Sequence, residues 1–544
     1  MSSQRPYRTF IVSWACIFIG AVLASCAAVQ ADGLPERNES ATITSGLDGA
    51  WTLAQAVGTD ATSPTATPKN SVEVTVQEAI LLALENNRSL RVERFNPLIR
   101  HTFEEEERAI FDPLVTAGMS ASREREKEPR AGGGFSDETT SEVNAGAGIS
   151  KFFSTGTTVG VDVSTDNTRS DVDADEHTTR IGLTATQALL RGRGTDLNLA
   201  SVRQAEIDTR ISQYELRGFT EALVAAVEET YWDFALAKRE IEIVTESLKV
   251  AEQQLSETEV RIKVGKLPEI ELAAIQAEVA SRREALINAR STLEQTRLSL
   301  LRLLNPSGPN LWDREVLLRE RPALRDLRLD AVNSHVQVAL RMRPDMNQAR
   351  LDVKRGDLEI VKTKNGLLPR MDFFITLGKT GYADSFGDSI KDLDGKGYDV
   401  LAGITFRYFL GNRDARSRHR RALLSQDQSG EALDNLAQLV QVDVRSAYIE
   451  VNRAREQVAA TAATRAFREA TVRAETEKFR VGKSTSFLVA QAQRDLLVSQ
   501  IAESRAVANY LKAFIQLYRL EGSLLERRGI SAPGREPVKL SFNR

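Results

Sequence analysis

Two patterns of hydrophobic and polar positions divide this chain of 544 residues into long unbroken stretches and short stretches that alternate strictly. The long stretches, Asp196–Arg261 and Asp414–Arg480, are rich in Ala, Glu, Arg and Leu. Each lacks proline and contains a single glycine, Gly218 or Gly430. They predict two helices about 100 Å long, at about 1.5 Å per residue. Helices of this length need partners along their sides, which predicts coiled-coil-like packing.

Both long segments end in the same turn. The two turns are Val264-Gly265-Lys266 and Val481-Gly482-Lys483, which lie 217 positions apart. A glycine just past the last helical turn adopts the left-handed conformation that closes a helix. We therefore expect the chain to reverse at both turns and to return as shorter helices, at about 268–304 and 486–520.

The openings of the two halves also match, at an offset of 256 positions. Ala83-Leu84 corresponds to Ala339-Leu340, and Pro113 corresponds to Pro369. Each opening, about 76–109 or 330–366, predicts an amphipathic helix. We interpret the chain as an internal two-fold repeat, with repeat 1 at 72–304, a linker at 305–329 and repeat 2 at 330–521.

Between each opening and its long helix, residues alternate with period two, which is typical of half-buried strands. Val159, Val161 and Val163 alternate with Gly160, Asp162 and Ser164, and similar runs lie near 115–121, 143–149, 181–185, 373–377 and 398–408. We expect four strands in repeat 1 and two in repeat 2. Repeat 1 is longer before its turn, which predicts an additional hairpin at about 143–165 that reverses at Ser154-Thr155-Gly156-Thr157.

Strands of this length suit either a soluble antiparallel sheet or a membrane barrel whose outer face meets lipid. One chain with four to six strands cannot close a barrel, because known barrels begin at about eight strands and hydrocarbon offers an open edge no hydrogen-bond partner. Several chains must then share one barrel, most simply around a cyclic axis. The predicted fold class is an α+β membrane protein, in which a long antiparallel α-helical coiled-coil barrel continues into a shared trans-subunit β-barrel.

The first 26 residues are typical of a secretory signal, with Arg5 and Arg8 before the apolar stretch Phe10–Leu23. This stretch is short for a membrane span, which disfavours a retained anchor helix. Two cleavage sites stay open. One is a lipoprotein-type box that ends at Cys26, the residue that would carry lipid, and the other lies near residue 31. Residues 27–71 predict a disordered tether, and residues 522–544 predict a C-terminal tail.

Composition excludes several kinds of chemistry. A formal net charge of −3, from 72 Lys+Arg and 75 Asp+Glu, gives no reason to expect a nucleic-acid partner. Both cysteines, Cys16 and Cys26, lie in the signal region, so the body of the chain has no disulfide or cysteine metal site. Four scattered histidines form no ligand-spaced pair. We find no catalytic constellation, metal site or cofactor site and do not expect an enzyme.

Over about 73–522 the chain resembles the TolC-like outer membrane efflux protein family. The features that carry the resemblance are the openings Val74–Ala79 and Ala83–Asn87, the strand exit Gln187–Gly192, the segment Leu410–Arg416 and the twin Val-Gly-Lys turns. Each motif is weak alone, and their order, spacing and duplication make the resemblance specific.

The resemblance implies a homotrimer in the bacterial outer membrane whose helices form a periplasmic tunnel. It implies partners, a periplasmic adaptor protein and an inner-membrane pump, in tripartite efflux or type I secretion. The turns around Gly265 and Gly482 would then be the periplasmic tips where adaptor hairpins dock. A periplasmic coiled-coil scaffold and a stand-alone porin stay open as alternatives.

Related channels carry carboxylates just after these turns, which constrict the entrance. Glu271 falls at one such position, and the other interpretation of this residue is an ordinary solvated glutamate. The corresponding positions of the second repeat hold Leu488 and Gln491. A doubly acidic gate is therefore not expected, and an apolar or amide constriction is predicted in its place.

Overall fold

The computed structural model of this protein describes residues 71–129, 133–171, 175–308, 310–320, 322 and 329–539. The predicted signal, both cleavage sites with Cys26, and the tether up to residue 70 lie outside the described residues. Where the chain is described, no helix is both long enough and apolar enough to cross a membrane.

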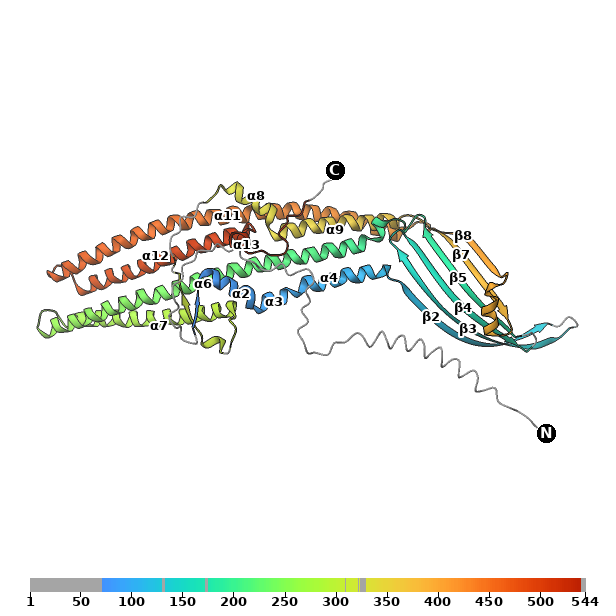
Figure 1. The fold of residues 1–544 in the computed structure, drawn as a ribbon. Coiled ribbons are helices and arrows are strands. Elements are labelled where there is room, and N and C mark those ends of the chain that lie inside the picture. Colours follow the sequence, from blue (N-terminus) through green and yellow to red (C-terminus); the bar gives the residue numbers. More distant parts are fainter. Residues whose placement is uncertain are drawn as a thin grey trace, which may run out of the picture. The chain divides into compact units, whose positions relative to one another are not determined.

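Six strands form one antiparallel sheet in the order β2-β3-β4-β5-β7-β8 (Figure 1). They are β2 (Leu114–Pro129), β3 (Phe135–Phe153), β4 (Thr157–Ser170), β5 (Glu176–Ala188), β7 (Arg370–Ala383) and β8 (Tyr398–Arg407). Four strands come from the first half of the chain and two from the second. The additional hairpin consists of β3 and β4, which lie inside the sheet and are longer than the range 143–165.

Two long helices and two return helices make up most of the helical part. They are α6 (Ala200–Lys263), α7 (Ile270–Leu304), α11 (Arg413–Arg480) and α12 (Ser486–Leu520), and the short α5 (Thr195–Asn198) precedes α6. Each return helix packs along the long helix before it, and α12 also packs on α6. The two long helices predicted from the sequence, Asp196–Arg261 and Asp414–Arg480, agree with α6 and α11 within a few residues.

The two opening segments are not single helices, which corrects the prediction for 76–109 and 330–366. The first is divided into α2 (Val76–Asn86), α3 (Arg88–Glu93), α4 (Phe95–Arg108) and the 3₁₀ turn η1 (Ala109–Phe111), and the second into α8 (Val332–Met342) and α9 (Pro344–Gly366). The side chain of Asn87 accepts a hydrogen bond from the Leu90 N–H at 3.1 Å and so starts a new helix. Pro344 has no N–H to continue α8 and begins α9.

The linker and the tail are both built into the helical part. In the linker, η2 (Leu311–Asp313) precedes β6 (Glu315–Leu318), which pairs in parallel with β1 (Ser71–Val74). The predicted tail is wrong for 522–539, because this segment folds back onto the core through α13 (Leu524–Arg527). Leu524 and Leu525 are fully buried there, and Arg528 donates to Glu228 of α6 at 2.6 Å.

The main hydrophobic core lies where α2, α6, α7, α11, α12 and α13 meet. Its aromatic residues include Tyr231 and Trp232 of α6, whose rings stack edge to face at 5.2 Å, and Phe514 of α12. The hydroxyl of Tyr231 donates to the carbonyl of Val74 at 3.3 Å and ties β1 to this core. Between β7 and β8 the chain forms α10 (Phe386–Lys391) and the 3₁₀ turn η3 (Asp392–Asp394), which pack on β7.

Candidate functional site

The six-stranded sheet has an apolar face that is open to solvent in the single chain. One row of paired residues crosses the whole sheet on this face: Val115, Ile149, Val161, Leu183, Leu377 and Val400. Their exposed fractions range from 40% for Leu377 to 71% for Val115. An apolar strand face that remains uncovered by the chain itself is typical of strands that meet lipid.

The apolar side chains on this face form a band, which crosses the hydrogen-bonded rows of the sheet at an angle. On β2 it extends from Val115 to Ala121, away from the helices, whereas on β8 it extends from Val400 to Phe406, toward them. The centre of the band therefore shifts by about six residues between β2 and β8, which are five strand spacings apart. This shift corresponds to a strand tilt of about 40°. Strands of membrane barrels tilt by about 35–45° relative to the bilayer normal. The band therefore has the slope of a lipid-facing belt.

The opposite face of the sheet is polar and carries an ion cluster. Arg180 of β5 donates to Asp399 of β8 at 2.8 and 3.1 Å and to Asp162 of β4 at 3.3 Å. Its guanidinium crosses Gly182 and Gly378, where an added Cβ would lie only 2.6 Å from a guanidinium nitrogen. Glycine at both positions gives the guanidinium its room. Two carboxylates against one guanidinium leave this face with a local negative charge.

The sheet has two open edges. In the described part of the chain, β2 pairs only with β3, and β8 pairs only with β7. In water such an edge is a template for further strands, and in hydrocarbon its N–H and C=O groups have no partner. The sheet of a single chain is therefore incomplete at both edges.

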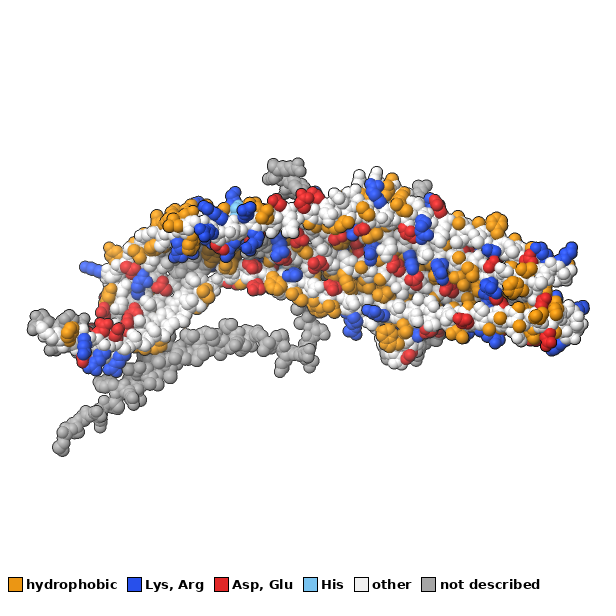
Figure 2. All heavy atoms as spheres, turned by 180° about the vertical axis from the view of Figure 1, so that it is seen from behind, with side chains coloured by type: hydrophobic (Ala, Val, Ile, Leu, Met, Phe, Trp, Pro, Cys, Tyr) orange, Lys and Arg blue, Asp and Glu red, His pale blue; other side chains and the backbone are white. Residues whose placement is uncertain are grey.

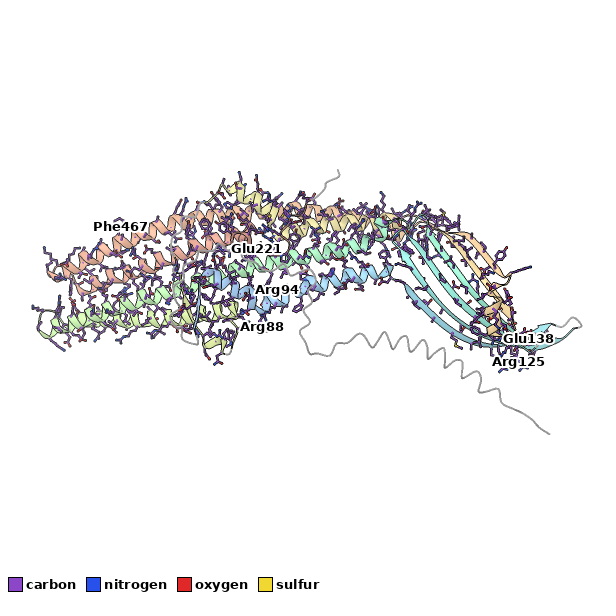
Figure 3. The ribbon with its side chains drawn as sticks, in the orientation of Figure 1. Arg88, Arg94, Arg125, Glu138, Glu221 and Phe467 are labelled. Carbon is purple, nitrogen blue, oxygen red and sulfur yellow. The ribbon has the colours of Figure 1, made fainter. Side chains whose placement is uncertain are left out.

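The helical layer next to the sheet follows the same order as the strands. α4 packs on α6, α6 on α9 and α9 on α11, so α4 and α11 are its two edges. Both edges expose apolar side chains, which are Phe95, Leu98, Ile99 and Phe103 on α4, and Leu424, Leu439 and Val442 on the part of α11 that lies beside α9. Phe467, also on α11 and 74% exposed, lies toward the end of the helices that is far from the sheet (Figure 3).

The two Val-Gly-Lys turns close their helices in the same way. Lys266 N–H donates to the Arg261 carbonyl and Lys483 N–H to the Lys478 carbonyl, both at 2.8 Å. Gly265 and Gly482 have φ angles of +70° and +72°, the left-handed region that this closure requires. Val264 and Val481 are 61% and 67% exposed. The two turns thus end their helices with closed caps and present an apolar residue and a lysine to solvent.

The two tips contact each other, which sequence reasoning did not find. The guanidinium of Arg261 lies 5.0 Å from the ring centre of Phe479, a cation–π distance. Across the same junction Glu271 accepts hydrogen bonds from the hydroxyl of Ser486 and, at 3.4 Å, from its N–H. The internal repeat places both turns at equivalent positions but gives no sign that they are neighbours in space.

The three residues predicted near the entrance have different environments. Glu271 is half-buried and is held by the start of α12, whereas Leu488 and Gln491 lie further along α12 and are exposed. A further acid that the sequence did not single out, Glu475, accepts hydrogen bonds from Lys478 at 2.6 Å and from Ser484 at 2.8 Å. These two contacts, with Lys478 the stronger, lower the pKa of Glu475 below its ordinary value.

Comparisons with known proteins agree with this geometry. The structure named for CusC has a TM-score of 0.61 to this chain at 17% sequence identity, and the likeness covers 85% of this chain and 99% of that one. This likeness shows that the chain has the fold of TolC-like channels. The family model for outer membrane efflux proteins matches residues 157–306 and 335–523, more than half of the chain.

The chain therefore belongs to the outer membrane efflux protein family, which is located in the bacterial outer membrane and extends into the periplasm. Among its relatives is the pyoverdine export outer membrane protein OpmQ of Pseudomonas putida, 23% identical over 308 residues, or 55% of this chain and 62% of that protein. Another is the cobalt-zinc-cadmium resistance protein CzcC of Cupriavidus metallidurans, 24% identical over 160 residues, or 29% of this chain and 38% of that protein. The matched stretches thus span less than two thirds of either relative.

Proposed function

We propose that three copies of this chain close into one channel that crosses the outer membrane and continues through the periplasm as a helical tube. The channel would export cargo delivered by an inner-membrane pump and a periplasmic adaptor, in a tripartite efflux or type I secretion system. One observation supports this proposal most directly. The sheet and the helical layer are both open, and their elements have the same order, so β2 and α4 lie at one open edge and β8 and α11 at the other.

The directions of the edge strands suit such closure. β2 leads away from the helices and β8 leads back toward α11, so the two edges run in opposite directions. β8 of one copy and β2 of the next can then pair as antiparallel strands, and the same step covers the exposed apolar residues of α11 and α4. Three copies, the number that the TolC-like resemblance implies, contribute eighteen strands, within the range of known membrane barrels.

The tips are the surface that we propose for adaptor docking. Val264, Lys266, Val481 and Lys483 surround the two glycine turns, and all four are exposed. The Arg261–Phe479 contact brings the two turns together, so one copy presents both to a partner. A neighbouring pair of small apolar and cationic ends suits the helical hairpin tips of an adaptor.

The entrance constriction is proposed at the start of the return helices. Glu271 is engaged by Ser486 within one chain, which reduces its availability to the lumen. Leu488 and Gln491 are exposed on α12, so a ring of these residues, one set from each copy, would form the apolar and amide constriction. Cys26 is proposed as the lipid-carrying residue on the strength of its lipoprotein-type box alone.

Mass and conductance together test the closed trimer. We expect the detergent-solubilised full chain to have the mass of three copies and to form pores of uniform conductance in planar bilayers. A water-soluble monomer that forms no pore would contradict the proposal and favour a scaffold.

A photo-crosslinker tests the docking surface and separates it from a stand-alone porin. Placed at Lys266 or Lys483, it should capture a periplasmic adaptor protein in cells of the native host. The same group at Lys238, exposed in the middle of α6, is the control and should not. Equal capture from all three positions, or none, would contradict tip docking.

A further inference from the structure

The far end of β2 carries a strict alternation of charge. Its residues Arg123, Glu124, Arg125, Glu126 and Lys127 are all exposed. Figure 3 labels Arg125 at this end of the sheet together with Glu138 of β3. Figure 2 shows basic and acidic side chains in separate groups at the same end.

The register assigns the two signs of charge to different faces. β2 pairs with β3 without interruption from Leu114 to Pro129, so alternate residues keep their side throughout. Arg123, Arg125 and Lys127 are therefore on the side of Val115 and the apolar band. Glu124 and Glu126 are on the polar side, together with Glu138 of β3.

The basic row begins where the apolar band ends. Arg123 is the next residue on that face after Ala121, the last apolar residue of the band on β2. On β7, Lys379 likewise follows Leu377 on the same face. Side chains just beyond a lipid-facing belt lie at the level of the lipid head groups.

Counter-charges on the chain offset this row only in part. Arg125 pairs with Asp137 of β3 at 2.6 Å, and both side chains are largely exposed, at 69% and 44%. Exposed pairs of this kind are weak, and a phosphate competes well for a guanidinium. Arg123 and Lys127 add positive charge beside this pair.

We propose that Arg123, Arg125 and Lys127 bind the anionic phosphate groups of lipids in the outer leaflet. This inference rests on the proposed function, because it needs the apolar face to lie in the membrane. Closure of the barrel would strengthen the site, since β2 of one copy would lie next to β8 of the neighbour, with Lys379 of that neighbour one strand further. The site then lies at the seam between copies, where bound lipid links them.

The test uses the full-length trimer in nanodiscs of phosphatidylcholine, either alone or with lipid A, a phosphorylated glycolipid. We expect lipid A to bind and to raise the temperature at which the trimer dissociates. The variant R123Q/R125Q/K127Q should bind lipid A about fivefold more weakly for each charge removed and lose most of the thermal gain. The control E124Q/E126Q, altered on the same strand but on the polar face, should keep both.

The outcomes separate the lipid site from the channel. Equal lipid A binding by the native chain and the triple variant, or an equal loss in the control, would overturn the lipid site. Inorganic phosphate that reproduces the thermal gain would also overturn it, because a free ion would then suffice. In phosphatidylcholine alone the triple variant should keep the mass and conductance of the native trimer. A native chain that forms no trimer in either lipid would overturn the proposed function and the lipid site with it.

Discussion

The sheet and the helical layer both have open edges in the single chain, but the groups exposed at these edges differ. At β2 and β8 the exposed groups are unpaired main-chain N–H and C=O, and any strand of suitable direction can form hydrogen bonds with them. At α4 and α11 the exposed groups are particular side chains, such as Phe103 and Leu424. A sheet edge therefore specifies direction and register, whereas a helical edge specifies shape.

The additional hairpin shows what this difference permits. α4 and α6 pack directly on each other, although their strands, β2 and β5, are separated by β3 and β4. The turn at 154–156 fits against the junction of β5 and α5, where Asn198 donates to the Ser154 carbonyl at 2.9 Å. Two strands were thus accommodated in the sheet while α4 and α6 stayed in contact.

The largest effect is expected from a charge on the apolar face of the sheet. Val161→Arg places a guanidinium in the middle of the apolar run of β4 and should destabilise the membrane-inserted chain by about 2–4 kcal/mol. Thr184→Arg, on the polar face of β5, is the matched control and should cost much less. Unfolding in urea from lipid vesicles measures both, and equal losses would mean that the apolar face does not meet lipid.

A smaller effect is expected from a buried acid in the helical part. Burial raises the pKa of Glu221 to about 8, and Arg217, 3.2 Å away, offsets this only partly because it is shared with Glu526. The folded chain then holds a proton that the unfolded chain releases near pH 4.5, so stability falls as the pH rises from about 4.5 to about 8.

Glu221→Gln should remove this loss and make the helical part more stable at pH 8 than that of the native chain. Thermal unfolding measured across this pH range tests the effect. Glu215→Gln, at an exposed position of the same helix, is the control and should leave the pH profile unchanged. A steeper decline in the Glu221 variant would show that its carboxylate is charged and stabilising.

The smallest effect is expected at the tips. Gly482→Ala forces a φ of +72° on a residue with a Cβ and should cost about 1 kcal/mol. Gly430→Ala, inside α11 where a Cβ meets nothing within 4 Å, should instead stabilise the helix by about 0.5–1 kcal/mol. Hydrogen exchange near each site measures both, and the same sign at both positions would contradict the cap.

Local patterns predicted the elements well because their causes are local. Alternation around Val161 indicated β4, and the scarcity of glycine and proline before Gly482 placed the end of α11 at Arg480, where the structure has it. The break at Asn87 also had a local cause, a side chain that caps α3, but apolar periodicity does not register it.

Contacts between distant elements had no local sign. The Arg180 cluster joins the consecutive strands β4 and β5 to β8, which is distant in the chain, and the Arg261–Phe479 contact joins the two tips. In the C-terminal segment the prolines Pro533 and Pro537 suggested a tail. The apolar residues Leu524 and Leu525, which anchor it to the core, were the signal that this interpretation overlooked.

The even number of strands in each copy has a consequence for how the assembly stops growing. Since every copy begins with a strand in one direction and ends with one in the other, rings of any size satisfy the alternation equally well. Hydrogen bonding alone therefore sets no limit on subunit number. The number of subunits is then set by the angle at which α4 and α11 of neighbouring copies pack. Substitutions in these two helices should therefore change the stoichiometry more than substitutions in the strands.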